Sequence, residues 1–135
     1  MRDRPADIRA ALEMPADITL VSGGSSVGQE DHVPSLLGAL GELAIHGIAM
    51  RPSSPTGMGR VGKRLVFLLP GNPVSCLCAY DFFAGRAIRA LGGLNKDWPY
   101  RRRLVRLARK LVSTVGRVDY ARVQLCGNEA EPVAV

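Results

Sequence analysis

The sequence predicts an α/β domain built around a mostly parallel sheet, with helices on both faces of that sheet. Two observations support this prediction. Short apolar segments with the length of buried strands alternate with longer amphipathic segments, and loops rich in glycine or proline separate them. In folds of this kind the ligand crevice lies beyond the carboxyl ends of the strands. We therefore expect the loops that follow the strands to hold the functional residues.

The first part of the chain predicts a strand, a glycine loop and a helix. A short helix is expected over residues 3–15, because the apolar spacing is helical and a proline closes the segment. Residues 17–21 form a candidate buried strand, and the segment SGGSSVGQ follows it as a loop. A second helix is expected over 31–43, because Pro34 falls in its first turn and leucines recur on one face.

A second unit of the same kind follows. Residues 44–51 can form a strand, and the segment 51–63 is expected to be a long Pro-, Ser- and Gly-rich loop before the strand 64–69. The turn PGNP at 70–73 then opens a helix that runs to about Leu91. The loop after the first strand and this turn should lie at the same end of the sheet.

The pattern changes in the last third of the chain. Residues 101–112 have leucines at helical spacing, whereas 120–125 alternate like a strand. The strand-like run 131–135 has no later segment to pair with it, and such an uncovered edge would promote aggregation, so the C-terminus looks incomplete. We divide the chain into one domain over 1–93 and part of another over 94–135.

Composition narrows the class of protein. At 135 residues with 47% hydrophobic residues, the chain can form a globular core, and its apolar runs are far shorter than the roughly 20 residues that span a membrane. We expect no membrane segment and a cytoplasmic location.

The three cysteines match no disulfide framework or usual zinc spacing, which favours buried thiols. The net charge of +6 favours an anionic partner, but the 5% aromatic content makes base stacking with nucleic acid unpromising.

Two segments have the residue types of an anion site. The loop at 22–28 lies between a strand and a helix, so its backbone N–H groups can converge on a phosphate or molybdate; the alternative is a tight turn without a ligand. Asp31 can either cap the following helix or stand beside a bound phosphate, where it would hold Mg²⁺ or position water. In the PGNPVS turn, Ser75 offers a hydroxyl near a helix start, although an ordinary turn has the same residues.

Two other motifs are weaker. The letters G-x-G-x-x-G at 57–62 match a dinucleotide fingerprint, but that fingerprint needs a helix after it, and here a strand is expected. The histidines, His32 and His46, have no partner at metal spacing and are interpreted as surface or packing residues.

Three segments in one order, SGGSSVGQED, AMRPSSPTG and LPGNPVSCL, resemble the molybdopterin-binding domain of molybdopterin molybdenumtransferases and the related C-terminal domain of gephyrin. The later segment GRVDYARV resembles the opening of that family's small C-terminal β-barrel. The resemblance implies a three-layer fold of the molybdopterin-binding type, incomplete here, followed by the start of a β-barrel. It also favours a strand over a helix at 101–112.

The resemblance implies an activity as well: insertion of molybdate into adenylylated molybdopterin, with hydrolysis of the phosphoanhydride, a divalent metal such as Mg²⁺, and release of AMP. Asp31 then becomes the catalytic and metal-binding residue. The residues expected to bind the pterin substrate and its anions are Gly23, Gly24, Ser26, Gly28, Arg51, Ser54, Gly71, Asn72, Ser75 and Arg122.

One departure from the family weakens this expectation. The family's K-P-G-K-P run is R-P-S-S-P here, so Arg51 keeps one cation and Ser54 replaces the other. Losing a cation beside an oxyanion should weaken anion binding.

Four hypotheses follow for the function. The first is part of a molybdenumtransferase, with little turnover alone and a homodimer or complementing chain to complete it. The second is a non-catalytic pterin-binding or scaffold module. The third is the adenylyltransferase of the preceding step, which the long PSSPTG loop and the PGNPVS turn disfavour. The fourth is nucleic-acid binding through the basic residues at 101–110, which predicts a steep dependence on salt.

Overall fold

The computed structural model describes residues 4–24 and 32–134. In chain order its elements are α1 (Pro5–Glu13), β1 (Ile18–Ser22), α2 (His32–Leu40), β2 (Glu42–His46), β3 (Met50–Arg51), β4 (Gly57–Val61), β5 (Arg64–Leu69), α3 (Pro73–Ala79), the π-helical segment η1 (Tyr80–Ala84), α4 (Gly85–Leu91), β6 (Arg106–Leu107), β7 (Val118–Asp119), β8 (Arg122–Cys126) and β9 (Glu129–Ala134). No helix in the described ranges is long and apolar enough to cross a membrane.

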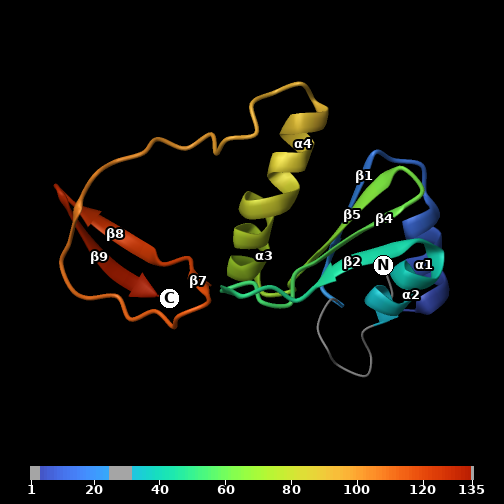
Figure 1. The fold of residues 1–135 in the computed structure, drawn as a ribbon, viewed down its shortest axis with the longest axis horizontal. Coiled ribbons are helices and arrows are strands. Elements are labelled where there is room, and N and C mark those ends of the chain that lie inside the picture. The colour runs from blue at the N-terminus through green and yellow to red at the C-terminus, as the bar shows by residue number, and fades with distance from the viewer. Residues whose placement is uncertain (1–3, 25–31, 135) are drawn as a thin grey trace.

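The main sheet has four strands in the order β1-β5-β4-β2 (Figure 1). β1 runs parallel to β5, whereas β4 is antiparallel to both β5 and β2. The α/β class is therefore confirmed, but the described sheet is mixed and not mostly parallel. The reason is local: Gly62 and Lys63 alone connect β4 to β5, and a two-residue connection can join only antiparallel strands.

Helices cover both faces of this sheet, as the three-layer prediction requires. Side chains of β5 alternate between the faces. Val66 and Leu68 pack in one core with residues of α1 and α2. Phe67 and Leu69 pack in a second core with Ala79 and Ala84, at the end of α3 and in η1. In Figure 1, α1 and α2 lie to the right of the sheet, and α3 and α4 stand to its left.

Two expected boundaries were wrong, and glycine explains both. The second helix ends at Leu40 because β2 begins directly after Gly41, where a Cβ atom would lie 2.1 Å from the Arg60 carbonyl oxygen. The expected loop at 51–63 contains the strand β4. A Cβ on Gly59 would lie 2.1 Å from the Glu42 carbonyl oxygen, so glycine allows β4 to approach β2 closely. The same glycines made the segment look like a loop.

The helix after the PGNP turn reaches Leu91, as expected, but one turn of it is π-helical. Its start is fixed by Asn72, whose side-chain oxygen accepts hydrogen bonds from the backbone N–H groups of Val74 (3.1 Å) and Ser75 (3.2 Å). Such an N-cap satisfies donors that the first helical turn leaves unpaired.

The last third of the chain forms a second, small sheet in the order β6-β9-β8. The run that was expected to lack a partner is β9, which pairs with β8 and β6 and so lies in the centre of this sheet. Residues 101–112 form no helix and contain the two-residue strand β6, in line with the strand that the resemblance favoured. None of the described sheets closes into a barrel.

The hairpin of β8 and β9 lies on the far side of α3 and α4 from the main sheet (Figure 1). Two features connect it to the rest. β7 pairs with β3 in parallel, and the Tyr120 ring packs edge-on against Phe82 of η1, with centroids 5.4 Å apart. Trp98 packs against the same phenylalanine at 4.9 Å.

Candidate functional site

Two of the three sequence motifs lie side by side at the carboxyl ends of β1 and β5. These parallel strands end in register at Ser22 and Leu69, and the Gly23 N–H donates to the Leu69 carbonyl oxygen at 3.1 Å. A Cβ atom on Gly71 would lie 3.4 Å from the Gly23 Cα. Gly23 and Gly24 both have positive φ, at 83° and 60°, which glycine adopts readily. The glycine loop and the PGNP turn therefore share one end of the sheet.

The third motif packs against the first turn of α3. The Ser53 hydroxyl donates to the Ser75 carbonyl oxygen at 2.6 Å, and Ser53 is only 2% exposed. The Thr56 hydroxyl, which is fully buried, donates to the Ser53 carbonyl oxygen at 2.7 Å. The loop after β3, which includes a cis Arg51–Pro52 peptide bond, is thus fixed beside Ser75.

Ser54 has a different environment from its neighbour. It is exposed, and its carbonyl oxygen accepts a hydrogen bond from the Ile48 N–H at 2.8 Å. Sequence reasoning missed the anchoring roles of Ser53 and Thr56, because a Ser- and Pro-rich segment is typical of a solvated loop.

The two candidate cations, Arg51 and Arg122, are exposed. Arg51 ends β3, and its carbonyl oxygen accepts from the Tyr120 N–H at 2.7 Å. Arg122 is the first residue of β8, and its charge acts on Cys78. Cys78 lies one helical turn after Ser75 in α3. Burial and the charge of Asp81 raise the pKa of the Cys78 thiol, and the Arg122 charge opposes them. The charge of Arg122 therefore acts on α3, the helix to which Ser75 also belongs.

The cysteines are all free, and one of them lies at the site. The Cys76 sulfur is 3.6 Å from the Ser22 hydroxyl oxygen, where α3 meets the end of β1. The expectation of buried thiols is confirmed for Cys78, whereas Cys126 is exposed. Cys76 was not predicted as a site neighbour, and only the pairing of β1 with β5 could have indicated it.

Three expected site residues, Ser26, Gly28 and Asp31, lie outside the described residues. Over residues 4–24 and 32–134 there is no group of three or more His, Cys, Asp or Glu side chains able to hold a metal ion. Direct contacts join some of the described candidates at one end of the main sheet: Gly71 lies against Gly23, which Gly24 follows, and Asn72 bonds to Ser75. Arg51 and Ser54 flank the loop that the Ser53–Ser75 bond fixes, whereas Arg122 is related to α3 through its charge on Cys78.

A mixed α/β sheet, with two glycine turns side by side at the carboxyl ends of two parallel strands, defines a domain suited to an anionic ligand. Residues 1–90 match the family model described as "probable molybdopterin binding domain". The chain belongs to this family of molybdopterin-binding domains.

Known relatives agree with this assignment. The chain is 36% identical over 113 residues to molybdopterin molybdenumtransferase 1 of Mycobacterium tuberculosis, a match that covers 82% of this chain and 26% of that protein. It is 33% identical over 113 residues to the molybdopterin molybdenumtransferase of Haemophilus influenzae, covering 83% of this chain and 28% of that protein. The chain thus spans about a quarter of the length of these curated relatives.

A solved structure has the same fold over nearly the whole chain. The crystal structure of the molybdopterin biosynthesis MoeA protein from Pyrococcus horikosii superposes with a TM-score of 0.73 at 32% identity. The match covers 97% of this chain and 31% of that one. The small C-terminal sheet is therefore included in the likeness, beyond the 90 residues of the family model.

Proposed function

We propose that this chain forms the pterin- and anion-binding part of a molybdopterin molybdenumtransferase, which inserts molybdate into adenylylated molybdopterin with release of AMP. The observation that best supports the proposal is the convergence of three motifs through two contacts. Gly71 lies against Gly23, and the Ser53 hydroxyl bonds to Ser75. The names of the curated relatives support molybdenum transfer to molybdopterin, and the adenylylated substrate and the release of AMP are part of our proposal.

Each part of the site has a proposed role. The backbone of Gly23 and Gly24, together with Ser26 and Gly28, surrounds a phosphate of the ligand. Arg51 and Arg122 supply positive charge for molybdate or phosphate. Asn72 holds the first turn of α3 and accepts a hydrogen bond from the Ser75 hydroxyl at 3.5 Å, and that hydroxyl is the proposed ligand contact of α3.

Asp31 is the proposed catalytic carboxylate and metal ligand. It directly precedes α2, whose first residue is His32. A single carboxylate is a sufficient protein contribution for Mg²⁺, since this ion is commonly held by one or two carboxylates together with substrate phosphates and water. The bound cation would neutralise charge on the phosphoanhydride, and Asp31 would hold that cation or position the attacking water.

We also propose that a second copy or a complementing chain completes the site. Large apolar side chains are exposed on the helix and on the segment that follows it. Leu77 is 66% exposed, Leu104 97% and Val115 100%. Such surfaces are commonly covered in an assembly. Turnover is then expected to require residues that this chain alone does not provide.

Binding of adenylylated molybdopterin, measured by titration calorimetry, tests the proposal. We expect Arg51→Gln to weaken binding about tenfold, because one charge-assisted contact is worth about 1.5 kcal/mol. Ser26→Ala should weaken binding as well. Lys63→Gln, which removes an exposed cation in the β4–β5 turn, is the matched control and should bind like the wild type. A folded wild-type chain without affinity, or equal losses in Arg51→Gln and Lys63→Gln, would contradict the proposal.

A second candidate function is a non-catalytic pterin-binding or scaffold module. Ser54 favours it, because the exposed serine stands where the family has a lysine. Molybdate-dependent release of AMP from the bound ligand separates the two functions. Release that Asp31→Ala abolishes supports the enzyme. Tight binding with release no faster than in Asp31→Ala, even with a complementing chain present, supports the scaffold.

A further inference from the structure

The short strand β3 depends on the C-terminal part of the chain. β3 belongs to no larger sheet, and its strand partner in the described structure is β7. The Val118 N–H donates to the Ala49 carbonyl oxygen at 2.9 Å, and the Tyr120 N–H donates to that of Arg51 at 2.7 Å. These bonds place Arg51 in register with Asp119. In-register residues of neighbouring strands have their side chains on the same face.

Asp119 is held firmly at this position. Its carboxylate accepts two hydrogen bonds from the Arg117 guanidinium, at 2.9 and 3.3 Å, and its side chain is only 8% exposed. The Tyr120 ring next to it is packed against Phe82 and Trp98. The carboxylate is therefore a fixed charge and not a mobile surface group.

Arg51 is close to this fixed charge without being paired to it. Within residues 4–24 and 32–134 Arg51 forms no ion pair, whereas Asp119 pairs with Arg117. The Arg51 charge nevertheless acts on Asp119, as one of the influences that lower the pKa of its carboxyl after the Ser113 and Arg117 hydrogen bonds. The N–H donors of the Arg51 guanidinium thus stay available to a ligand. An anion bound there would also be repelled by the negative charge of Asp119.

We propose that Asp119 is a specificity-determining residue of this site: held by Arg117, its carboxylate offsets part of the positive charge of Arg51 and limits the affinity for oxyanions. The inference rests on the proposed function, because it takes Arg51 as an anion ligand. An oxyanion beside Arg51 is attracted by the guanidinium and repelled by Asp119. The repulsion is larger for a dianion than for a monoanion, so removing it changes both affinity and charge preference.

Titration calorimetry with sodium molybdate and sodium nitrate tests this on the full chain. Asp119→Asn keeps the shape of the side chain and one acceptor for Arg117, and we expect it to bind molybdate three to ten times more tightly. Its gain for nitrate should be smaller. Glu131→Gln is the control, because Glu131 lies in β9 of the C-terminal sheet and, like Asp119, pairs with an arginine, here Arg109 at 3.7 Å. It removes the same charge and should change the affinity less than twofold.

A double-mutant cycle shows whether the effect passes through Arg51. In an Arg51→Gln background the gain from Asp119→Asn should disappear. A gain that persists unchanged in that background, equals that of Glu131→Gln, or is replaced by weaker binding overturns the inference.

If the wild type binds no molybdate, the proposed function fails. The influence of Asp119 on the Arg51 side chain is then measured by NMR without a ligand. The Nε–Hε resonance of Arg51, assigned with Arg51→Lys, should shift in Asp119→Asn and not in Glu131→Gln. An unchanged resonance would overturn the inference on its own.

Discussion

The Ser53 hydroxyl donates a 2.6 Å hydrogen bond to the carbonyl oxygen of Ser75, and this bond joins the loop after β3 to the first turn of α3. The two residues belong to different sequence motifs. Ser53 is buried and has a φ of 97°, in the region that favours glycine. Its hydroxyl thus anchors a backbone conformation that a serine adopts at a cost.

Replacing Ser53 separates these two effects. We expect Ser53→Ala to lower the free energy of unfolding by about 1–2 kcal/mol, because a part-buried hydrogen bond between the loop and α3 is lost. Ser53→Gly loses the same bond but accepts the positive φ, so it should be less destabilising than alanine by about 0.5–1 kcal/mol. Urea unfolding measures both, with the exposed Ser54→Ala as the near-neutral control. Equal losses for alanine and glycine would show that the backbone at Ser53 is unstrained.

Gly59 and Gly38 should respond oppositely to alanine. A Cβ on Gly59 would lie 2.1 Å from the Glu42 carbonyl oxygen, so β2 would have to move, at a cost of about 2 kcal/mol or more. Gly38, inside α2, has no atom within 4 Å of an added Cβ, and alanine there should stabilise the helix by about 0.5–1 kcal/mol. Thermal unfolding of the two variants tests this pair, and a stable Gly59→Ala protein would contradict the close strand packing.

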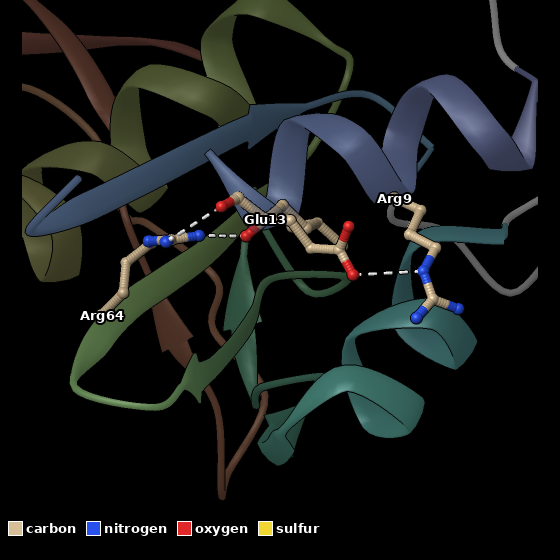
Figure 2. A network of polar contacts seen from close by, with 4 residues as sticks. Arg9, Glu13 and Arg64 are labelled. Carbon is tan, nitrogen blue, oxygen red and sulfur yellow. Dashed lines mark hydrogen bonds and ion pairs between the residues drawn. The ribbon is translucent and has the colours of Figure 1, made fainter. Parts of the chain in front are cut away.

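Arg64, the first residue of β5, caps the C-terminal end of α1 with its side chain (Figure 2). Its guanidinium donates to the carbonyl oxygens of Leu12, Glu13 (3.4 Å) and Ala16 (3.1 Å). Arg64→Ala should therefore lower the free energy of unfolding by about 1–2 kcal/mol. The nearby Arg9, which pairs with Glu13 at the surface, is the control, and Arg9→Ala should cost at most about 0.5 kcal/mol. Similar losses for the two arginines, measured by urea unfolding, would mean that the capping bonds contribute little.

The three cysteines should react at very different rates with a thiol reagent at pH 8. Burial raises the pKa of the Cys78 thiol, so a smaller fraction is thiolate, and its sulfur is also shielded. Cys126 is exposed and should react first, whereas Cys78 should react only when the helix opens. Cys126→Ser should remove the fast phase and leave the slow one. A fast phase that survives in Cys126→Ser and is lost when Cys78→Ser is added to that variant would show that α3 opens readily.

Elements with a strong periodic pattern could be predicted from the sequence, and so could the place where their loops meet. The helix from Pro73 to Leu91 and the strand β5 were expected within a residue or two, because apolar spacing and Pro73 mark them. The convergence of the glycine loop with the PGNP turn follows from parallel pairing of β1 and β5.

What the sequence did not reveal depends on contacts between distant residues. β4 was expected as a loop, because Gly57 and Gly59 hide a strand that needs them for close packing. The bond from Ser53 to Ser75 joins residues 22 positions apart, and no local pattern indicates it. The pairing of β3 with β7 is likewise invisible locally, since each strand has two residues and no periodicity to detect.

Asp119 should make the stability of the protein sensitive to acid. The Ser113 and Arg117 hydrogen bonds lower the pKa of its carboxyl below the ordinary value of 3.8, and the Arg51 charge adds to this. A carboxyl whose pKa is lower in the folded state stabilises the fold above its unfolded pKa, and this contribution is lost as the pH falls through the folded value.

The Asp119→Asn variant has no carboxyl at this position and so no such titration. The difference in free energy of unfolding between wild type and Asp119→Asn should thus be constant from pH 7 to about 5 and should shrink below about pH 4. Urea unfolding at a series of pH values measures it, with Glu131→Gln as the control for loss of an exposed carboxylate. If wild type and Asp119→Asn lose stability in parallel down to pH 3, the Asp119 carboxylate is not held in the folded protein as the Arg117 contacts indicate.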